Sequence, residues 1–249
     1  MAGSIVMSMV NSGPSRRGVL AAVRMAGLAL VLTAGGIGMG GNIAAAQSSA
    51  DPLVKANEPY KTISADKRSD TVMLPLMGKM AKPPKVIDEP LKAALMPATA
   101  SDWSAIEAWT TGETQKAVLE GLKTVTEEND WKKAYGFGLP YGAERADPDL
   151  IAAGMYVELG DPPTLAAADF KYLPSVVNLS ILIQAETTRL LNDGKPYDAM
   201  ILLARGVHFG RQMADRAFYR EKIVGLDMML LATMRLRDAV YFDAHGESP

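Results

Sequence analysis

Along the second half of the chain, apolar residues recur every three or four positions, the spacing of one face of an α-helix. In the segment 112–129 they fall at positions 118, 119, 122 and 125. Three longer stretches of the same kind close the chain and predict helices over roughly 175–191, 196–213 and 216–242. No stretch in this half alternates between apolar and polar residues as a half-buried strand does. The pattern therefore predicts a mainly α-helical domain.

Turn and start signals separate the predicted helices. The sequence Asp193–Pro196 reads as the end of one helix and the start of the next, because glycine favours a helix C-terminus and proline the first helical turn. Asp147-Pro148 and Asp161-Pro162 each place a capping aspartate before a proline, so two further helix starts are predicted there. Connections this short force neighbouring helices to run antiparallel. We expect an antiparallel helical bundle or stacked helical hairpins.

One short segment adds a resemblance to this picture. Residues 131–144, "WKKAYGFGLPYGAE", faintly resemble the first helix of a tetratricopeptide repeat. No period of about 34 residues recurs along the chain. The resemblance therefore implies hairpin geometry only.

Residues 47–100 follow a different pattern from the α-helical domain, 101–249. Seven prolines fall within this segment, which leaves no room for a long helix. The stretch 71–80, "TVMLPLMGKM", is apolar, so we expect it to pack on the folded body. We interpret 47–100 as a proline-rich extended arm or linker that is partly ordered.

The first 46 residues read as an export signal: a charged region, a mildly apolar region and a small-residue end. Arg16 and Arg17 lie in "SRRGVL", residues 15–20, which resembles the twin-arginine export motif with Val19 in place of the usual phenylalanine. An ordinary secretory signal with an incidental arginine pair is the alternative. Both alternatives predict a protein that leaves the cytoplasm.

The end of this leader defines the expected mature chain. Ala44 and Ala46 fit a small-residue cleavage site and leave Gln47 as the first residue. The glycine-rich apolar region would make a poor membrane-spanning helix, so we expect no stable membrane span after cleavage. The resemblance to twin-arginine signals implies that the chain folds before export. We predict a periplasmic or secreted bacterial protein.

Composition narrows the possible chemistry. The chain has 26 basic and 28 acidic side chains, and this weakly acidic balance argues against nucleic acid as a partner. It has no cysteine, which excludes disulfides, thiolate zinc sites and iron–sulfur clusters. With only two histidines, and no Glu-x-x-His motif, a metal site is not expected. No motif of a known hydrolase or phosphate-binding loop occurs, so no cofactor and no catalytic residue are assigned.

Three consecutive predicted helices each carry one ionisable residue on or near an apolar face: Glu186, His208 and Asp227. On a helical wheel, His208 falls on a stripe with Tyr197 and Ile201, which we interpret as core. Buried charges are normally satisfied by one another, so a polar network that fixes helix register is the first interpretation. A small-ligand site at the same place is the alternative. The residues expected to flank His208 are Arg205, Arg211 and Gln212.

These observations suggest two functions. The first is an exported, non-enzymatic α-helical binding or scaffold protein that uses the surface of its helical hairpins to bind a protein partner. The second is an exported protein, possibly an enzyme, that binds an unidentified small ligand or cofactor near Glu186, His208 and Asp227.

Overall fold

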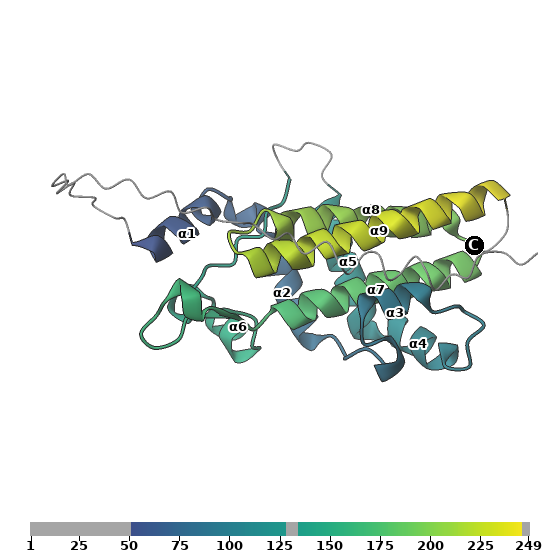
Figure 1. Ribbon diagram of the computed structural model, residues 1–249, viewed down its shortest axis with the longest axis horizontal. Coiled ribbons are helices and arrows are strands. Elements are labelled where there is room, and N and C mark those ends of the chain that lie inside the picture. Colours follow the sequence, from purple (N-terminus) through teal and green to yellow (C-terminus); the bar gives the residue numbers. More distant parts are fainter. Residues whose placement is uncertain (1–50, 128–133, 246–249) are drawn as a thin grey trace, which may run out of the picture. The chain divides into compact units, whose positions relative to one another are not determined.

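The computed structural model describes residues 51–127 and 134–245, with side chains described as far as Tyr241. The expected export signal and its residues Arg16, Arg17, Ala44 and Ala46 lie outside the described residues. The described part is mainly helical, as predicted (Figure 1). Its elements are α1 (Pro52–Lys61), α2 (Ser69–Lys79), α3 (Pro90–Leu95), α4 (Trp103–Thr110), α5 (Glu113–Thr126), α6 (Pro148–Ala152), β1 (Val157–Glu158), β2 (Asp169–Phe170), α7 (Leu173–Asn192), α8 (Pro196–Ala214) and α9 (Tyr219–His245), with short 3-10 helices at Ala65–Lys67, Lys85–Ile87, Ala143–Arg145 and Leu165–Ala167.

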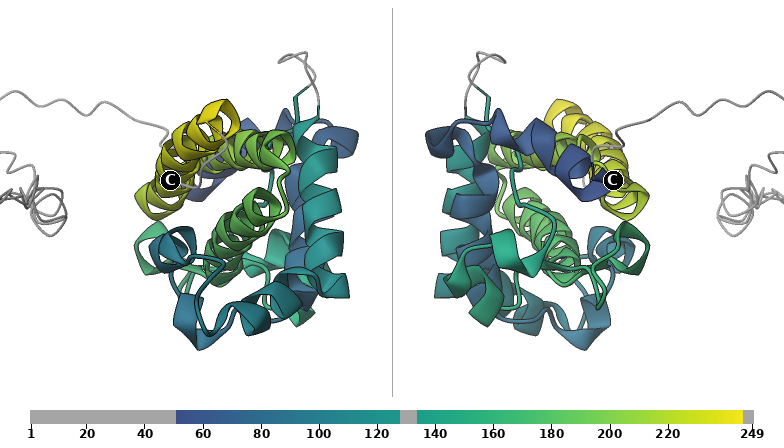
Figure 2. Two further views of the ribbon diagram at one scale, coloured as in Figure 1. Left: turned by 90° about the vertical axis from the view of Figure 1, so that its right-hand side faces the viewer. Right: turned by 90° about the vertical axis from the view of Figure 1, so that its left-hand side faces the viewer.

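Helix α7 lies at the centre of this arrangement. It packs against α2, α3, α4, α8 and α9, and the end-on views show it enclosed by them (Figure 2). Fourteen of its 20 residues are buried. A helix that is buried on nearly all sides belongs to the interior of a domain, and the leucines, isoleucines and valine buried between Leu173 and Leu191 supply most of the necessary apolar side chains.

Helices α8 and α9 form a long antiparallel hairpin over α7 (Figure 1). Two glycines bring their backbones into close approach. A Cβ atom on Gly225 would lie 2.5 Å from the carbonyl oxygen of Gly210, and one on Gly210 would lie 2.8 Å from that of Gly225. No real Cβ atom fits at such distances, so the hairpin requires glycine at both positions.

The segment 51–100 differs from the extended arm that its prolines suggested. It forms α1, α2 and α3, and α2 buries Met73, Leu74 and Met77 in the common core. The expectation that the stretch 71–80 packs on the folded body is confirmed. Pro75 lies inside α2, where burial of neighbouring apolar side chains offsets the hydrogen bond that proline cannot donate.

The two predicted aspartate–proline helix starts have different outcomes. Asp147 caps α6, accepting a hydrogen bond from the backbone N–H of Asp149 at 2.9 Å, and Pro148 takes the first helical position. No helix begins at Asp161-Pro162, where the peptide bond is cis. These two residues instead lie in the turn that connects the antiparallel strands β1 and β2.

Candidate functional site

The structure does not assemble the ligand site that the sequence suggested. Glu186 is buried on α7, but its carboxylate pairs with Arg189 of the same helix at 2.6 Å, and Arg189 also contacts Asp193 at 2.7 Å. His208 and Asp227 are both exposed, on α8 and α9 respectively. No three His, Asp or Glu side chains among the described residues are grouped so that they could hold a metal ion.

The placement of His208 on a core stripe is therefore wrong. The buried face of α8 carries Ala199, Leu203, Gly206 and Gly210, so the stripe that includes His208 points outward. Partial burial still raises the pKa of the Asp227 carboxyl above its usual value, and within residues 51–127 and 134–245 no hydrogen bond or ion pair of Asp227 is found.

The three residues expected to flank His208 have separate roles. Arg205 pairs with Glu127 of α5 at 3.3 Å, and Arg211 is exposed. Gln212 is buried and donates from Nε2 to the carbonyl of Val125 at 3.1 Å, which ties α8 to α5. They form no common network with His208.

The buried charge pair of the described residues lies elsewhere, at the corner between α8 and α9. Arg216 donates from Nε to Oε1 of Glu221 at 2.9 Å, and the side chains are 1% and 0% exposed. Glu221 stands in the first turn of α9 and accepts from the N–H of Phe218 at 3.4 Å, as an acidic residue at a helix N-terminus does. The sequence-based boundary at 216 placed both residues inside one helix and concealed this corner.

Tyrosines complete the surroundings of this pair. The hydroxyl of Tyr141 donates to Oε2 of Glu221 at 2.6 Å, and that of Tyr172 donates to Oε1. The guanidinium of Arg216 lies 4.1 Å from the ring centroid of Tyr60 and 4.4 Å from that of Tyr141, both within the range of cation–π attraction. We call Arg216, Glu221 and these three tyrosines the corner cluster.

Burial changes the ionisation of the corner cluster. It raises the pKa of the Tyr141 and Tyr172 hydroxyls, although the charge of Arg216 opposes this. Burial also disfavours the charge of Arg216, but the acidic groups of Tyr172 and Glu221 that face it raise its pKa above the usual value. The hydroxyls of Tyr141 and Tyr172 therefore stay protonated, and Arg216 keeps its positive charge.

The extended segment 136–141 is fixed to the first two helices by buried polar side chains. Asn57 of α1 accepts from the N–H of Tyr141 at 2.8 Å and donates to its carbonyl at 3.1 Å. Asp70 of α2 accepts from the N–H of Gly138 at 2.7 Å and pairs with Arg68 at 2.5 Å. Because every one of these contacts is internal, we assign Asn57, Asp70 and the corner cluster to holding the fold together rather than to binding a ligand.

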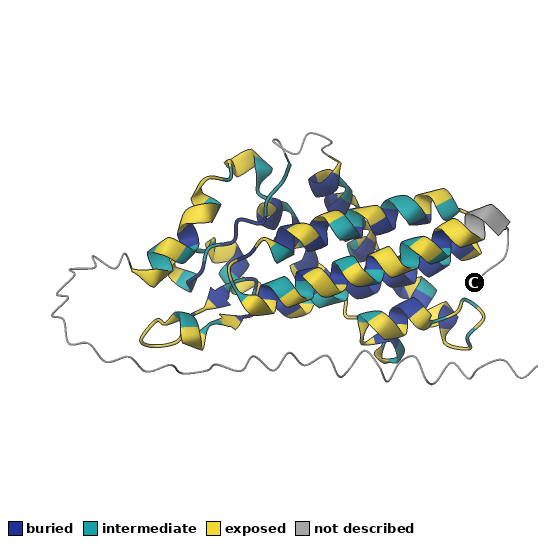
Figure 3. Cartoon of the chain, turned by 45° about the horizontal axis from the view of Figure 1, so that its top comes forward, coloured by how far each residue is buried: buried dark blue, intermediate teal, exposed yellow. Residues whose placement is uncertain are grey.

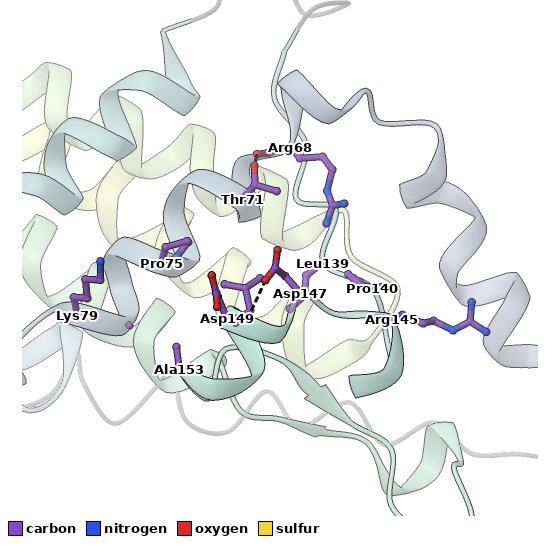
Figure 4. A pocket seen from close by; sticks show the side chains of 12 residues that line it. Arg68, Thr71, Pro75, Lys79, Leu139, Pro140, Arg145, Asp147, Asp149 and Ala153 are labelled. Atoms are coloured by element: carbon purple, nitrogen blue, oxygen red, sulfur yellow. Dashed lines mark hydrogen bonds between the residues drawn. The ribbon is translucent and has the colours of Figure 1, made fainter.

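A cleft of about 540 Å³ lies between α2 and α6 (Figure 4). Lys79 of α2 and Arg68, which precedes α2 and also pairs with Asp70, line one side of the cleft. The carboxylates of Asp147 and Asp149 point from the α6 side toward α2, while Arg145 points away. Its apolar lining is provided by Pro75, Leu139, Pro140, Leu150 and Ala153. The volume lies within the range of small-molecule sites.

A second candidate surface is the solvent-facing side of α9. Large apolar side chains recur every three or four residues from Tyr219 to Met234, and after the exposed Arg237 the row continues with Val240 and Tyr241. Figure 3 shows this side of the helix exposed beside its buried face. A groove of about 440 Å³ between the first turns of α7 and α9 opens at its N-terminal end. We call this surface the α9 face; its residues are Tyr219, Ile223, Leu226, Leu230, Met234, Val240 and Tyr241, between 36% and 75% exposed.

Comparisons of the chain with protein-family models, curated protein sequences and solved structures find no match. Within the described ranges, no helix has both the length and the apolar character to span a bilayer. Function must therefore be argued from the surfaces described above.

Proposed function

We propose that this chain is an exported α-helical binding protein, acting in the periplasm or outside the cell, that docks an α-helix of a protein partner on its α9 face. The observation that carries the proposal is the row of seven large apolar side chains on the exposed side of one 27-residue helix. Helices that bind a protein partner through an apolar face use anchors three and four residues apart, and α9 has this spacing from Tyr219 to Met234.

The size of the α9 face supports this function. The seven residues are on average about half exposed and together present on the order of 500 Å² of apolar surface. The largest apolar patch on a typical monomer covers about 300–600 Å², so this patch lies toward the upper end of that range. The largest apolar patch of a soluble protein is often a functional surface. The groove beside Tyr219 and Ile223 can receive an anchoring side chain.

The test is site-specific photo-crosslinking in the cells that produce the protein. A photoreactive amino acid replaces Leu226 or Leu230 on the α9 face, and Ala204, exposed on α8, serves as the matched control. Adducts with a protein from the two α9 positions and not from position 204 are expected. Equal adducts at all three positions, or none, would refute the proposed surface. Mass spectrometry of the periplasmic fraction should show a chain that begins at Gln47.

The cleft between α2 and α6 supports a second candidate function, binding of a small ligand with one acidic and one basic group. Its α2 side offers Arg68 and Lys79, and its α6 side offers Asp147 and Asp149. A panel of amino acids and short peptides should contain members that raise the melting temperature with a saturable dependence on concentration. Lys79→Gln should weaken that effect, and the absence of any such shift would exclude this function.

A further inference from the structure

We propose that the partner of the α9 face is a second copy of this chain, with the two α9 helices antiparallel about a twofold axis at Leu230. This inference rests on the proposed function, because it names the occupant of the same face. A closed twofold pair is the commonest symmetry of soluble oligomers, and it requires a surface that is complementary to itself.

The spacing of the apolar residues meets this requirement. Residues equally far from Leu230 on either side face one another across such an axis. Leu226 then lies opposite Met234 of the second copy, Tyr219 lies opposite Tyr241, and Leu230 lies opposite its own counterpart. All of these side chains are exposed in the single chain. Five of the seven residues of the α9 face therefore pair with one another in the antiparallel direction, whereas Ile223 lies opposite Arg237 and Val240 lies opposite Arg220.

The charged residues beside the apolar row also favour the antiparallel orientation of the two α9 helices. Arg220 and Asp238 are 18 residues apart, a whole number of helical turns, so both lie on one flank of α9. An antiparallel pair about Leu230 places Arg220 within about 3 Å, along the axis, of Asp238 of the second copy, at both ends. A parallel pair would instead leave Arg220 about 27 Å along the axis from Asp238 of the second copy. Arg220 is exposed and has no ion pair among the described residues, whereas Asp238 contacts only arginines of its own helix.

The available area suits a dimer. Interfaces between identical chains are about 65% non-polar, so roughly 500 Å² of apolar surface corresponds to about 800 Å² buried on each copy. That is the size of a standard stable interface. The row from Tyr219 to Tyr241 spans about 33 Å at the rise of an α-helix, long enough for two helices to pack over six turns.

The absence of cysteine in this chain allows a direct test of the geometry. In the full chain, Leu230→Cys should form a disulfide-linked dimer on mild oxidation, because the two sulfurs meet at the axis. Leu226→Cys alone should not, because its copies lie about 12 Å apart along an antiparallel pair, beyond disulfide reach. Mixing Leu226→Cys with Met234→Cys should give the mixed disulfide. Self-linking of Leu226→Cys as fast as that of Leu230→Cys would overturn the antiparallel arrangement.

Association is measured by sedimentation equilibrium of the unmodified chain and of surface variants. Leu230→Lys should weaken the dimer by at least 100-fold, and Ala204→Lys on α8 should leave it unchanged. Arg220→Asp and Asp238→Arg should each weaken it about tenfold, and combining them should restore it. Circular dichroism checks that each variant keeps its helical content and melting temperature.

The outcomes separate this inference from the proposed function. A chain that remains monomeric while crosslinkers at Leu230 capture a different protein overturns the dimer and leaves the binding face in place. A chain that binds anionic lipid vesicles through this face and remains monomeric likewise overturns the dimer. A monomer without any adduct overturns both proposals.

Discussion

Replacing Glu221 by glutamine tests how far the corner between α8 and α9 depends on its buried charge pair. Glu221→Gln keeps the shape of the side chain but removes its negative charge, so Arg216 becomes a buried cation without a counter-charge. Removing one partner of a buried pair costs about 3–5 kcal/mol. The free energy of unfolding of a domain is about 5–15 kcal/mol, so the loss should amount to about a fifth or more of the total.

Removing both charges gives a second, more specific expectation. Replacing a buried pair by apolar residues is often neutral or stabilising. In Arg216→Met/Glu221→Leu, however, Tyr172 loses the carboxylate that accepts from its hydroxyl, whereas Tyr141 keeps its contact with Tyr60 at 3.3 Å. An unpaired buried hydroxyl costs about 1–3 kcal/mol. Adding Tyr172→Phe to the double variant should therefore recover that amount.

The assay is urea unfolding of the full chain, followed by circular dichroism and extrapolated to water. The unmodified chain, Glu221→Gln, the double variant and the triple variant with Tyr172→Phe are compared under one condition. If the free energy of unfolding of Glu221→Gln lies within about 1 kcal/mol of that of the unmodified chain, the buried pair does not stabilise this corner as described, because breaking such a pair costs more. A further loss of stability when Tyr172→Phe is added to the double variant would contradict the role of the unpaired hydroxyl.

Three other predictions concern the remaining internal contacts. Gly225→Ala should destabilise the chain by about 1–3 kcal/mol, because its Cβ would meet backbone atoms of α8 at 2.5 Å. Gly78→Ala, whose Cβ would make ordinary contacts at 3.5 Å, should stabilise the chain by up to about 1 kcal/mol. Equal melting temperatures for the two variants would contradict this. Asn57→Ala should lower the free energy of unfolding by about 1–3 kcal/mol, because it unpairs two buried backbone groups of Tyr141, and a loss too small to resolve by urea unfolding would show that Asn57 does not fix the segment 136–141. Burial raises the pKa of Tyr141 and Tyr172 above the unfolded value of about 10, so their contribution to stability is intact below that pH and is lost as the pH rises above it. Their phenolate absorbance should appear only as helical circular dichroism disappears, and ionisation of both in the folded chain would refute the assignment.

The long helices could be predicted from the sequence because their local signals agree with their packing. The turn Asp193–Pro196 ends α7 and begins α8 where expected, and the apolar spacing of α5 matches its buried residues Val118, Leu122 and Val125. The segment 51–100 could not be predicted in the same way. Its prolines locally disfavour helix, whereas α2 forms because tertiary contacts bury its apolar residues.

The corner cluster could not be predicted from the sequence for a related reason. Arg216 and Glu221 are five residues apart, and nothing local shows that Tyr141 and Tyr172 converge on them from 49 to 80 residues away. A usable signal was present in Glu221, which stands in the first turn of α9 as a capping residue does. It would have moved the start of α9 past Arg216.

The misplacement of His208 and the exposure of the α9 face have one physical cause. Helices α8 and α9 meet through small residues, with Gly210 against Gly225 and Gly206 near Ala232, so their backbones approach too closely for large side chains to lie between them. A helical wheel that ranks faces by hydrophobicity does not recognise small residues as a helix contact, so it predicts the stripe of Tyr197 and Ile201 as core although Tyr197 is exposed. Leaving the apolar side chains of the α9 face in water forgoes about 25 cal/mol for each Å² that could be buried. A second helix along α9 would recover that free energy, and the close α8–α9 contact is what leaves those side chains available for it.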